Sequence, residues 1–72
     1  MMNEKQIYRR MNECYESQYG DRDEDEWYGV DDPKIWRFYR PSEDLEVKMV
    51  MNEENKQIKV YEKQTYVGGY SW

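Results

Sequence analysis

The chain has 72 residues, with 11 Lys and Arg against 16 Asp and Glu and a formal net charge of −5. Its single Cys excludes an internal disulfide, and the absence of His removes the commonest general base. Residues 1–20 contain no uninterrupted apolar stretch, so no signal peptide or membrane span is predicted and we expect a soluble, cytoplasmic protein.

A helix is predicted over residues 4–19. Asn3 is a suitable N-cap, Gln6 stands in the capping-box position, and Gly20 is a natural stop. Apolar residues recur between them at helical spacing and predict one buried face: Ile7, Tyr8, Met11, Cys14, Tyr15 and Tyr19. Because Cys14 lies on that face, we expect it in the core and not as a nucleophile.

Residues 21–33 are predicted to form an acidic loop that contains the run "DRDEDEW". Residues 21–32 hold seven acids and one Arg, a local net charge of −6, so the other residues sum to +1. Asp21, Asp23 and Asp25 have the spacing of a calcium loop, but Glu26 stands where that loop needs Gly, and Pro33 ends the pattern. We therefore predict no metal site.

Two interpretations of the acidic loop stay open. It is either a solvated spacer, extended by mutual repulsion, or a surface that binds a basic protein. An extended chain advances about 3.3 Å per residue and one DNA strand carries a charge about every 3.4 Å, so the carboxylates match the charge density of nucleic acid. The second interpretation predicts these partner-binding residues: Asp21, Asp23, Glu24, Asp25, Glu26, Trp27, Tyr28, Asp31 and Asp32.

After Pro33 the sequence period changes to two, which predicts strands at 34–40, 45–51 and 56–63 and a possible edge strand at 65–67. The turns "PSED" and "NEEN" separate the first three. Gly68 and Gly69 are expected to loosen the chain after them.

The two turns also predict a register. Closing them pairs Trp36 with Met49 and Phe38 with Val47, then Met49 with Ile58 and Val47 with Val60, so one face of the sheet is apolar. The fold class is therefore predicted as α+β: one small domain, residues 1–72, with an N-terminal helix on a three- to four-stranded antiparallel sheet in the order αβββ.

The same register predicts a second candidate site on the opposite face of the sheet. Three cations would lie directly across three strands, beside two tyrosines and one acid: Arg37, Lys48, Lys59, Tyr39, Tyr61 and Glu46. Like charges in cross-strand pairs are destabilising, so the row should lie near an anion. Three explanations stay open: an internal anion from the acidic loop or Glu46, a phosphate-bearing ligand that stacks on the tyrosines, or simple tolerance of the row because its lysines are solvated and flexible.

The sequence thus predicts a non-enzymatic protein without a cofactor. In size, charge block and aromatic content the chain is similar to the small acidic inhibitors of phages and other mobile elements, among them anti-CRISPR and anti-restriction proteins. This resemblance implies a nucleic-acid mimic that binds a nuclease or another nucleic-acid-binding protein, without binding nucleic acid itself. Two alternatives stay open: an antitoxin or immunity protein that caps a basic toxin, and a phosphate-ligand or nucleic-acid binder that uses the basic row. No oligomeric state is predicted.

Overall fold

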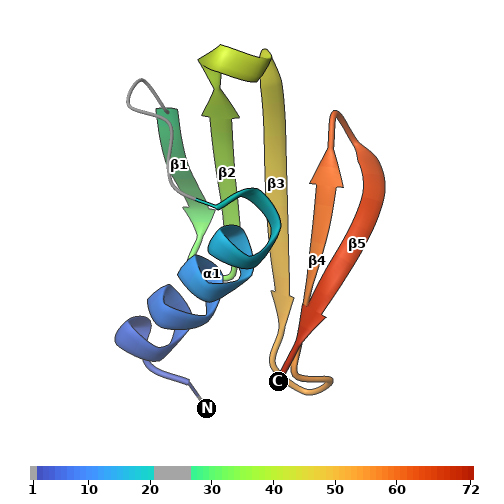
Figure 1. The fold of residues 1–72 in the computed structure, drawn as a ribbon. Coiled ribbons are helices and arrows are strands. Elements are labelled where there is room, and N and C mark those ends of the chain that lie inside the picture. The colour runs from blue at the N-terminus through green and yellow to red at the C-terminus, as the bar shows by residue number, and fades with distance from the viewer. Residues whose placement is uncertain (1, 21–26) are drawn as a thin grey trace.

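The computed structural model describes residues 2–20 and 27–72 and shows an α+β fold, with one helix packed on a five-stranded antiparallel sheet (Figure 1). The strands lie side by side in chain order, β1-β2-β3-β4-β5. The elements are α1 (Glu4–Tyr19), β1 (Trp27–Asp32), β2 (Ile35–Arg40), the 3₁₀ turn η1 (Pro41–Glu43), β3 (Leu45–Asn52), β4 (Gln57–Glu62) and β5 (Thr65–Ser71). The predicted fold class is confirmed, although the sheet has five strands and not three or four.

The helix has the predicted bounds and cap. The Asn3 side chain accepts a hydrogen bond from the Gln6 backbone N–H at 2.9 Å, and the Gln6 side chain accepts one from the Asn3 N–H at 3.0 Å. At the other end Gly20 has a φ of 74° and donates to the Glu16 carbonyl, a backbone conformation that favours glycine. Among the described residues, no helix is long and apolar enough to cross a membrane.

The core lies between α1 and one face of the sheet. The helix contributes Ile7, Met11, Cys14 and Tyr15, and the sheet contributes Trp36, Phe38, Val47, Met49, Met51, Ile58 and Val60, all buried. Tyr8 differs from the prediction: its ring centroid is 5.4 Å from that of Trp36, but the residue is 55% exposed because it lies at the margin of the apolar face.

One register prediction is confirmed and one is wrong. Between β2 and β3, Trp36 pairs with Met49 and Phe38 with Val47. Between β3 and β4 the ladder is shifted by two residues, so that Met49 pairs with Val60 and Val47 with Glu62. An even shift keeps the apolar residues on the same face.

The cause of the shift is the β3–β4 turn. Asn52 accepts a hydrogen bond from the Asn55 N–H through its side chain at 3.1 Å, and Lys56 has a left-handed φ of 52°. The turn therefore continues through Lys56, and the ladder closes at Asn52 and Gln57.

The two outer strands differ from the prediction, because β1 was not predicted as a strand and β5 is longer than its predicted bounds. Residues 27–32, expected as part of the acidic loop, form β1 and pair with β2 from Trp27 opposite Tyr39 onward. The run of β-formers that begins at Trp27 outweighs the acids beside it.

At the other edge, β5 continues through the glycine pair to Ser71, so Gly68 and Gly69 do not loosen the chain. A Cβ on Gly69 would come within 3.3 Å of the Ile58 carbonyl oxygen. Glycine at this position allows close pairing of β4 with β5.

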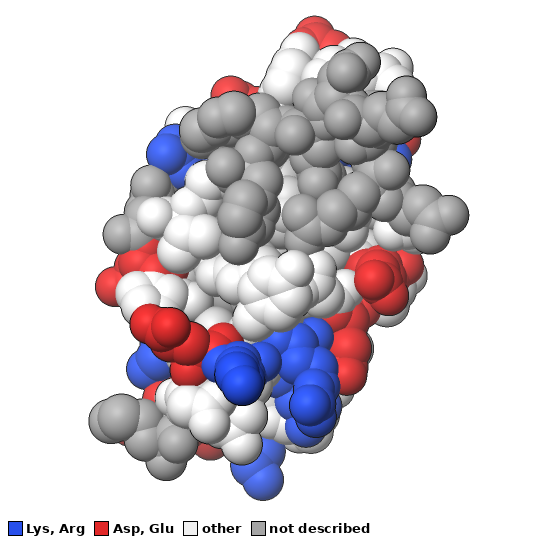
Figure 2. Space-filling model, turned by 90° about the vertical axis from the view of Figure 1, so that its left-hand side faces the viewer, with Lys and Arg blue, Asp and Glu red and all other residues white. Residues whose placement is uncertain are grey.

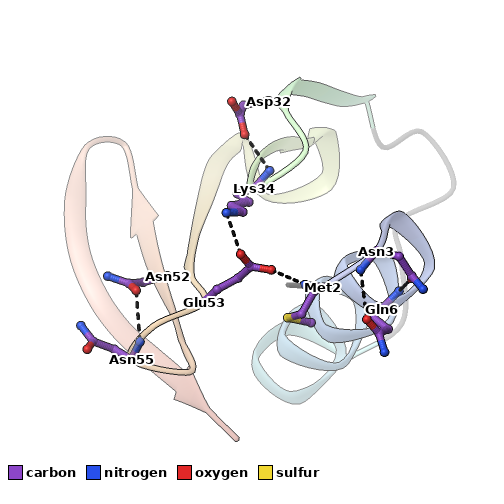
Figure 3. A network of polar contacts seen from close by, with 8 residues as sticks. All are labelled: Met2, Asn3, Gln6, Asp32, Lys34, Asn52, Glu53 and Asn55. Atoms are coloured by element: carbon purple, nitrogen blue, oxygen red, sulfur yellow. Dashed lines mark hydrogen bonds and ion pairs between the residues drawn. The ribbon is translucent and has the colours of Figure 1, made fainter.

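A carboxylate joins three separate segments at one end of the molecule (Figure 3). Glu53, in the β3–β4 turn, accepts a hydrogen bond from the Met2 N–H at 2.6 Å and forms an ion pair with Lys34 Nζ at 2.9 Å. The Lys34 N–H in turn donates to Asp32 Oδ1 at 3.0 Å. The ion pair with Lys34, followed by the hydrogen bond from Met2, lowers the pKa of Glu53.

Candidate functional site

The acidic segment, defined here as residues 21–26, lies outside the described residues, and with it Asp21, Asp23, Glu24, Asp25 and Glu26. In the sequence this segment comes directly before β1, which is an edge strand of the sheet. The backbones of Trp27, Tyr28 and Asp31 belong to this strand. Asp32 is exposed and is the last residue of β1. Its side chain accepts a hydrogen bond from the Lys34 N–H in the turn that follows.

The charge of the sequence is concentrated in the acidic segment. Residues 21–26 carry a net charge of −4 out of −5, which leaves −1 for the rest of the chain. On the face shown in Figure 2, which is the left-hand side of Figure 1, acidic and basic side chains of the described residues lie next to one another. This part of the surface is therefore mixed in charge, unlike the acidic segment.

A second feature is a hollow on the face of the sheet that α1 does not cover. Its volume is about 510 Å³. Strands β2, β3 and β4 and the β4–β5 turn supply its lining: Arg37, Phe38, Tyr39, Glu46, Val47, Lys48, Tyr61, Lys63 and Gln64. We call this feature the outer-face hollow.

Five of the six residues predicted for this site line the outer-face hollow, and Lys59 does not. Arg37 lies opposite Lys48, as predicted. Because of the shifted β3–β4 register, Lys48 faces Tyr61, and Lys59 lies opposite Val50. The predicted row of three cations across three strands is therefore wrong at its third member.

Lys63 is the third cation of the hollow and lies beside Glu46, whereas Tyr61 occupies the position opposite Lys48 that was predicted for Lys59. Lys63 follows β4 directly, and its backbone N–H donates to the Glu46 carbonyl at 3.1 Å, which holds the turn against β3. Among the described residues, the hollow thus combines the cations Arg37, Lys48 and Lys63 with one acid, Glu46, a net charge of +2 for these four. All four residues are exposed.

Two tyrosines complete the polar lining. The Tyr39 hydroxyl donates to Asp44 Oδ1 at 2.9 Å, and this hydrogen bond raises the pKa of Tyr39, so the phenol stays neutral. The Tyr61 ring packs edge-on against Tyr66, with centroids 5.8 Å apart. The hollow therefore offers cations and neutral aromatic rings side by side.

The backbone at one rim of the hollow is unusual. Lys63 and Gln64 form the β4–β5 turn, and both have left-handed φ values, 48° and 70°. Two-residue hairpin turns with this geometry strongly favour Asn-Gly, because other side chains are strained there. The sequence does not predict either residue as part of a site, since neither Lys nor Gln is a turn signal.

The only thiol of the chain is not placed to act as a nucleophile. Cys14 is fully buried in the core, and burial raises the pKa of its thiol to about 11, so it is not a thiolate at neutral pH. Within residues 2–20 and 27–72, no cluster of three or more His, Cys, Asp or Glu could hold a metal ion.

Comparison of the chain with models of protein families, with curated proteins and with solved structures finds no match. The function of the protein is therefore inferred from the two features above, the acidic segment and the outer-face hollow.

Proposed function

We propose that this protein is a small, non-enzymatic inhibitor that binds a nucleic-acid-handling protein and imitates the charge of nucleic acid. The observation that carries the proposal is the net charge of −4 within residues 21–26, directly before an edge strand. The target would be a nuclease or another protein with a basic groove. An anti-defence role in a phage or mobile element, in the cytoplasm, is the biological setting that we propose for it.

The arrangement supports capture in two parts. The carboxylates provide long-range attraction to a basic groove, which raises the association rate and weakens with salt. Charges alone give little desolvated contact, whereas β1 is an edge strand whose outer backbone groups can pair with a partner strand. Trp27 and Tyr28, the first residues of that strand, are of the types that most often anchor interfaces.

The proposal is tested by pull-down from a lysate of the source organism, with the captured proteins identified by mass spectrometry. The reversal Asp23→Lys, Asp25→Lys and Glu26→Lys should abolish capture of the target. A matched control, Glu4→Lys, Glu16→Lys and Glu54→Lys, makes the same change in net charge at exposed positions of α1 and the β3–β4 turn and should retain capture at low salt.

The identity of the captured protein distinguishes the proposed function from its alternatives. A nucleic-acid-binding enzyme that is released at high salt, and that duplex DNA or RNA displaces, supports the proposal. Capture of a basic toxin that does not act on nucleic acid would favour the antitoxin alternative, and recovery of nucleic acid in place of a protein would contradict both.

A further inference from the structure

We infer that the outer-face hollow is a binding site for a small phosphorylated ligand with a planar ring, of which a nucleotide is the simplest class. This inference goes beyond the proposed inhibitor function and does not depend on it, because it rests on described residues of β2, β3, β4 and the β4–β5 turn and not on the charge of the acidic segment.

The size and composition of the hollow suit a small ligand. Its volume of about 510 Å³ falls within the range of roughly 300–1,000 Å³ that is usual for small-molecule sites. Its lining brings charged and aromatic side chains together, whereas the side chains of Phe38 and Val47, which also border it, are buried in the core on the other face of the sheet. Such a site fits a ligand that has both a charged group and a flat apolar surface.

The placement of charge in the hollow favours an anion. Arg37 and Lys48 lie directly opposite each other on adjacent strands, an arrangement of like charges that costs stability. Lys63 adds a third cation to the same hollow, although the chain as a whole is acidic. A phosphate group is the common biological anion that Arg and Lys bind together, through charge-assisted hydrogen bonds.

The backbone at the rim of the hollow is strained. Lys63 and Gln64 occupy left-handed positions where Asn-Gly is the favoured pair. Strain of this kind is typical of functional sites, where a particular side chain is kept in spite of its cost. Here the strained pair brings an ammonium group and an amide to the hollow.

The aromatic residues favour a ring over phosphate alone. Tyr39 and Tyr61 both line the hollow, and a base that stacks on such a ring binds more tightly than phosphate alone. A small ligand is favoured over a polymer because the chain has a net charge of −5, which repels a long polyanion beyond the hollow.

The test is an NMR titration of the full chain with ATP, inorganic tripolyphosphate and adenosine, each at the same ionic strength. Two variants are compared: K48Q/K63N removes the hollow's lysines, and K59Q/K56N is its control. Each variant loses one strand lysine and one turn lysine with left-handed φ, 48° at Lys63 and 52° at Lys56. They therefore match in charge and in relief of strain.

We expect ATP to bind the wild type most tightly, tripolyphosphate more weakly and adenosine weakest of the three. The amide shifts should be centred on Lys48, Tyr61 and Gln64. K48Q/K63N should weaken ATP binding about tenfold or more, while K59Q/K56N changes it by about twofold at most.

Equal losses in the two variants would overturn the inference, because they would show attraction to general positive charge. Shifts in the wild type that are spread over the surface would overturn it even if a variant failed to fold. If tripolyphosphate binds as tightly as ATP, the planar ring does not contribute to binding and that part of the inference is wrong. If an oligonucleotide binds more tightly than ATP, the ligand is a nucleic acid and not a small molecule.

Discussion

Arg40 places a guanidinium group in the core face of the sheet, where the residue is only 7% exposed. Its Nη1 donates to the hydroxyl of the fully buried Tyr15, and its Nη2 lies 3.3 Å from Glu43 Oε1. The guanidinium carbon also lies 5.7 Å from the ring centroids of Tyr15 and Tyr19. A buried cation is tolerated only when such partners replace its hydration.

We therefore predict that Tyr15→Phe lowers the free energy of unfolding by about 1–3 kcal/mol, because it keeps the ring but removes the acceptor of a buried charged donor. Urea unfolding followed by tryptophan fluorescence measures the change. Tyr66→Phe is the control, since Tyr66 is 57% exposed, and should change stability by less than about 0.5 kcal/mol. Equal effects of the two substitutions would show that the Arg40 contact is not stabilising.

At the scale of elements, Glu53 connects the chain before α1, the β1–β2 turn and the β3–β4 turn through Met2 and Lys34. The pKa of Glu53 in the folded protein is lower than its ordinary value of 4.5. Its ionised form therefore stabilises the fold above that value, and this contribution is lost as the pH falls through the lower, folded pKa.

We predict that Glu53→Gln lowers the melting temperature at neutral pH and that its difference from the wild type shrinks as the pH falls below about 4.5. Thermal unfolding across the acid range measures this. Glu54→Gln, at the exposed neighbouring position, is the control and should show no comparable difference at neutral pH. A gap that stays constant to the acid end of the titration would rule out Glu53 ionisation as its cause.

The β4–β5 turn carries the second prediction at this scale. Lys63→Asn with Gln64→Gly replaces two strained residues by the pair that the turn favours, so the free energy of unfolding should rise by about 1–2 kcal/mol. The same variant should lose ATP affinity, because both replaced side chains line the outer-face hollow. Lys56→Asn relieves one left-handed position elsewhere and should gain stability without losing affinity.

Failure of the Asn-Gly variant to gain stability would show that the turn is not strained. A gain in stability with ATP binding unchanged would show that the turn is strained but that its side chains do not contribute to ATP binding. Denaturant unfolding and the NMR titration, applied to the same samples, distinguish these outcomes.

At this scale the sequence predicts those features that depend on residues close together in the chain or on simple strand alternation. The α1 cap and the β2–β3 register follow from adjacent residues, Asn3 with Gln6 and the alternation around Trp36 and Met49. The β3–β4 register does not, since it depends on Lys56 adopting a left-handed φ, which few Lys residues do.

The outer-face hollow is also only partly predictable from the sequence. Arg37, Lys48, Tyr39 and Tyr61 follow from strand alternation, but Lys63 enters only after the register has shifted and the turn has formed. The sequence does not predict β1, because acids occur both before Trp27 and at residues 31 and 32 and indicate one continuous loop. Pairing with β2 decides the structure there.

At the scale of the whole molecule, the charge of the acidic segment is unfavourable for a compact fold. Residues 21–26 hold five acids and one Arg, and like charges so close in sequence repel one another and oppose compaction. The described core residues come from α1 and β2–β4. The proposed role in binding would account for keeping these charges, whereas a role in folding would require that they stabilise the protein.

These two roles make opposite predictions for Asp23→Asn, Asp25→Asn and Glu26→Gln, which together change the net charge from −5 to −2 without adding a cation. We expect the free energy of unfolding to stay the same or to rise, because self-repulsion falls, while capture of the target in the pull-down is strongly reduced. Unfolding at low and high salt should also differ less in this variant than in the wild type. A clear loss of stability would assign the acids to the fold and leave their proposed role in binding without support.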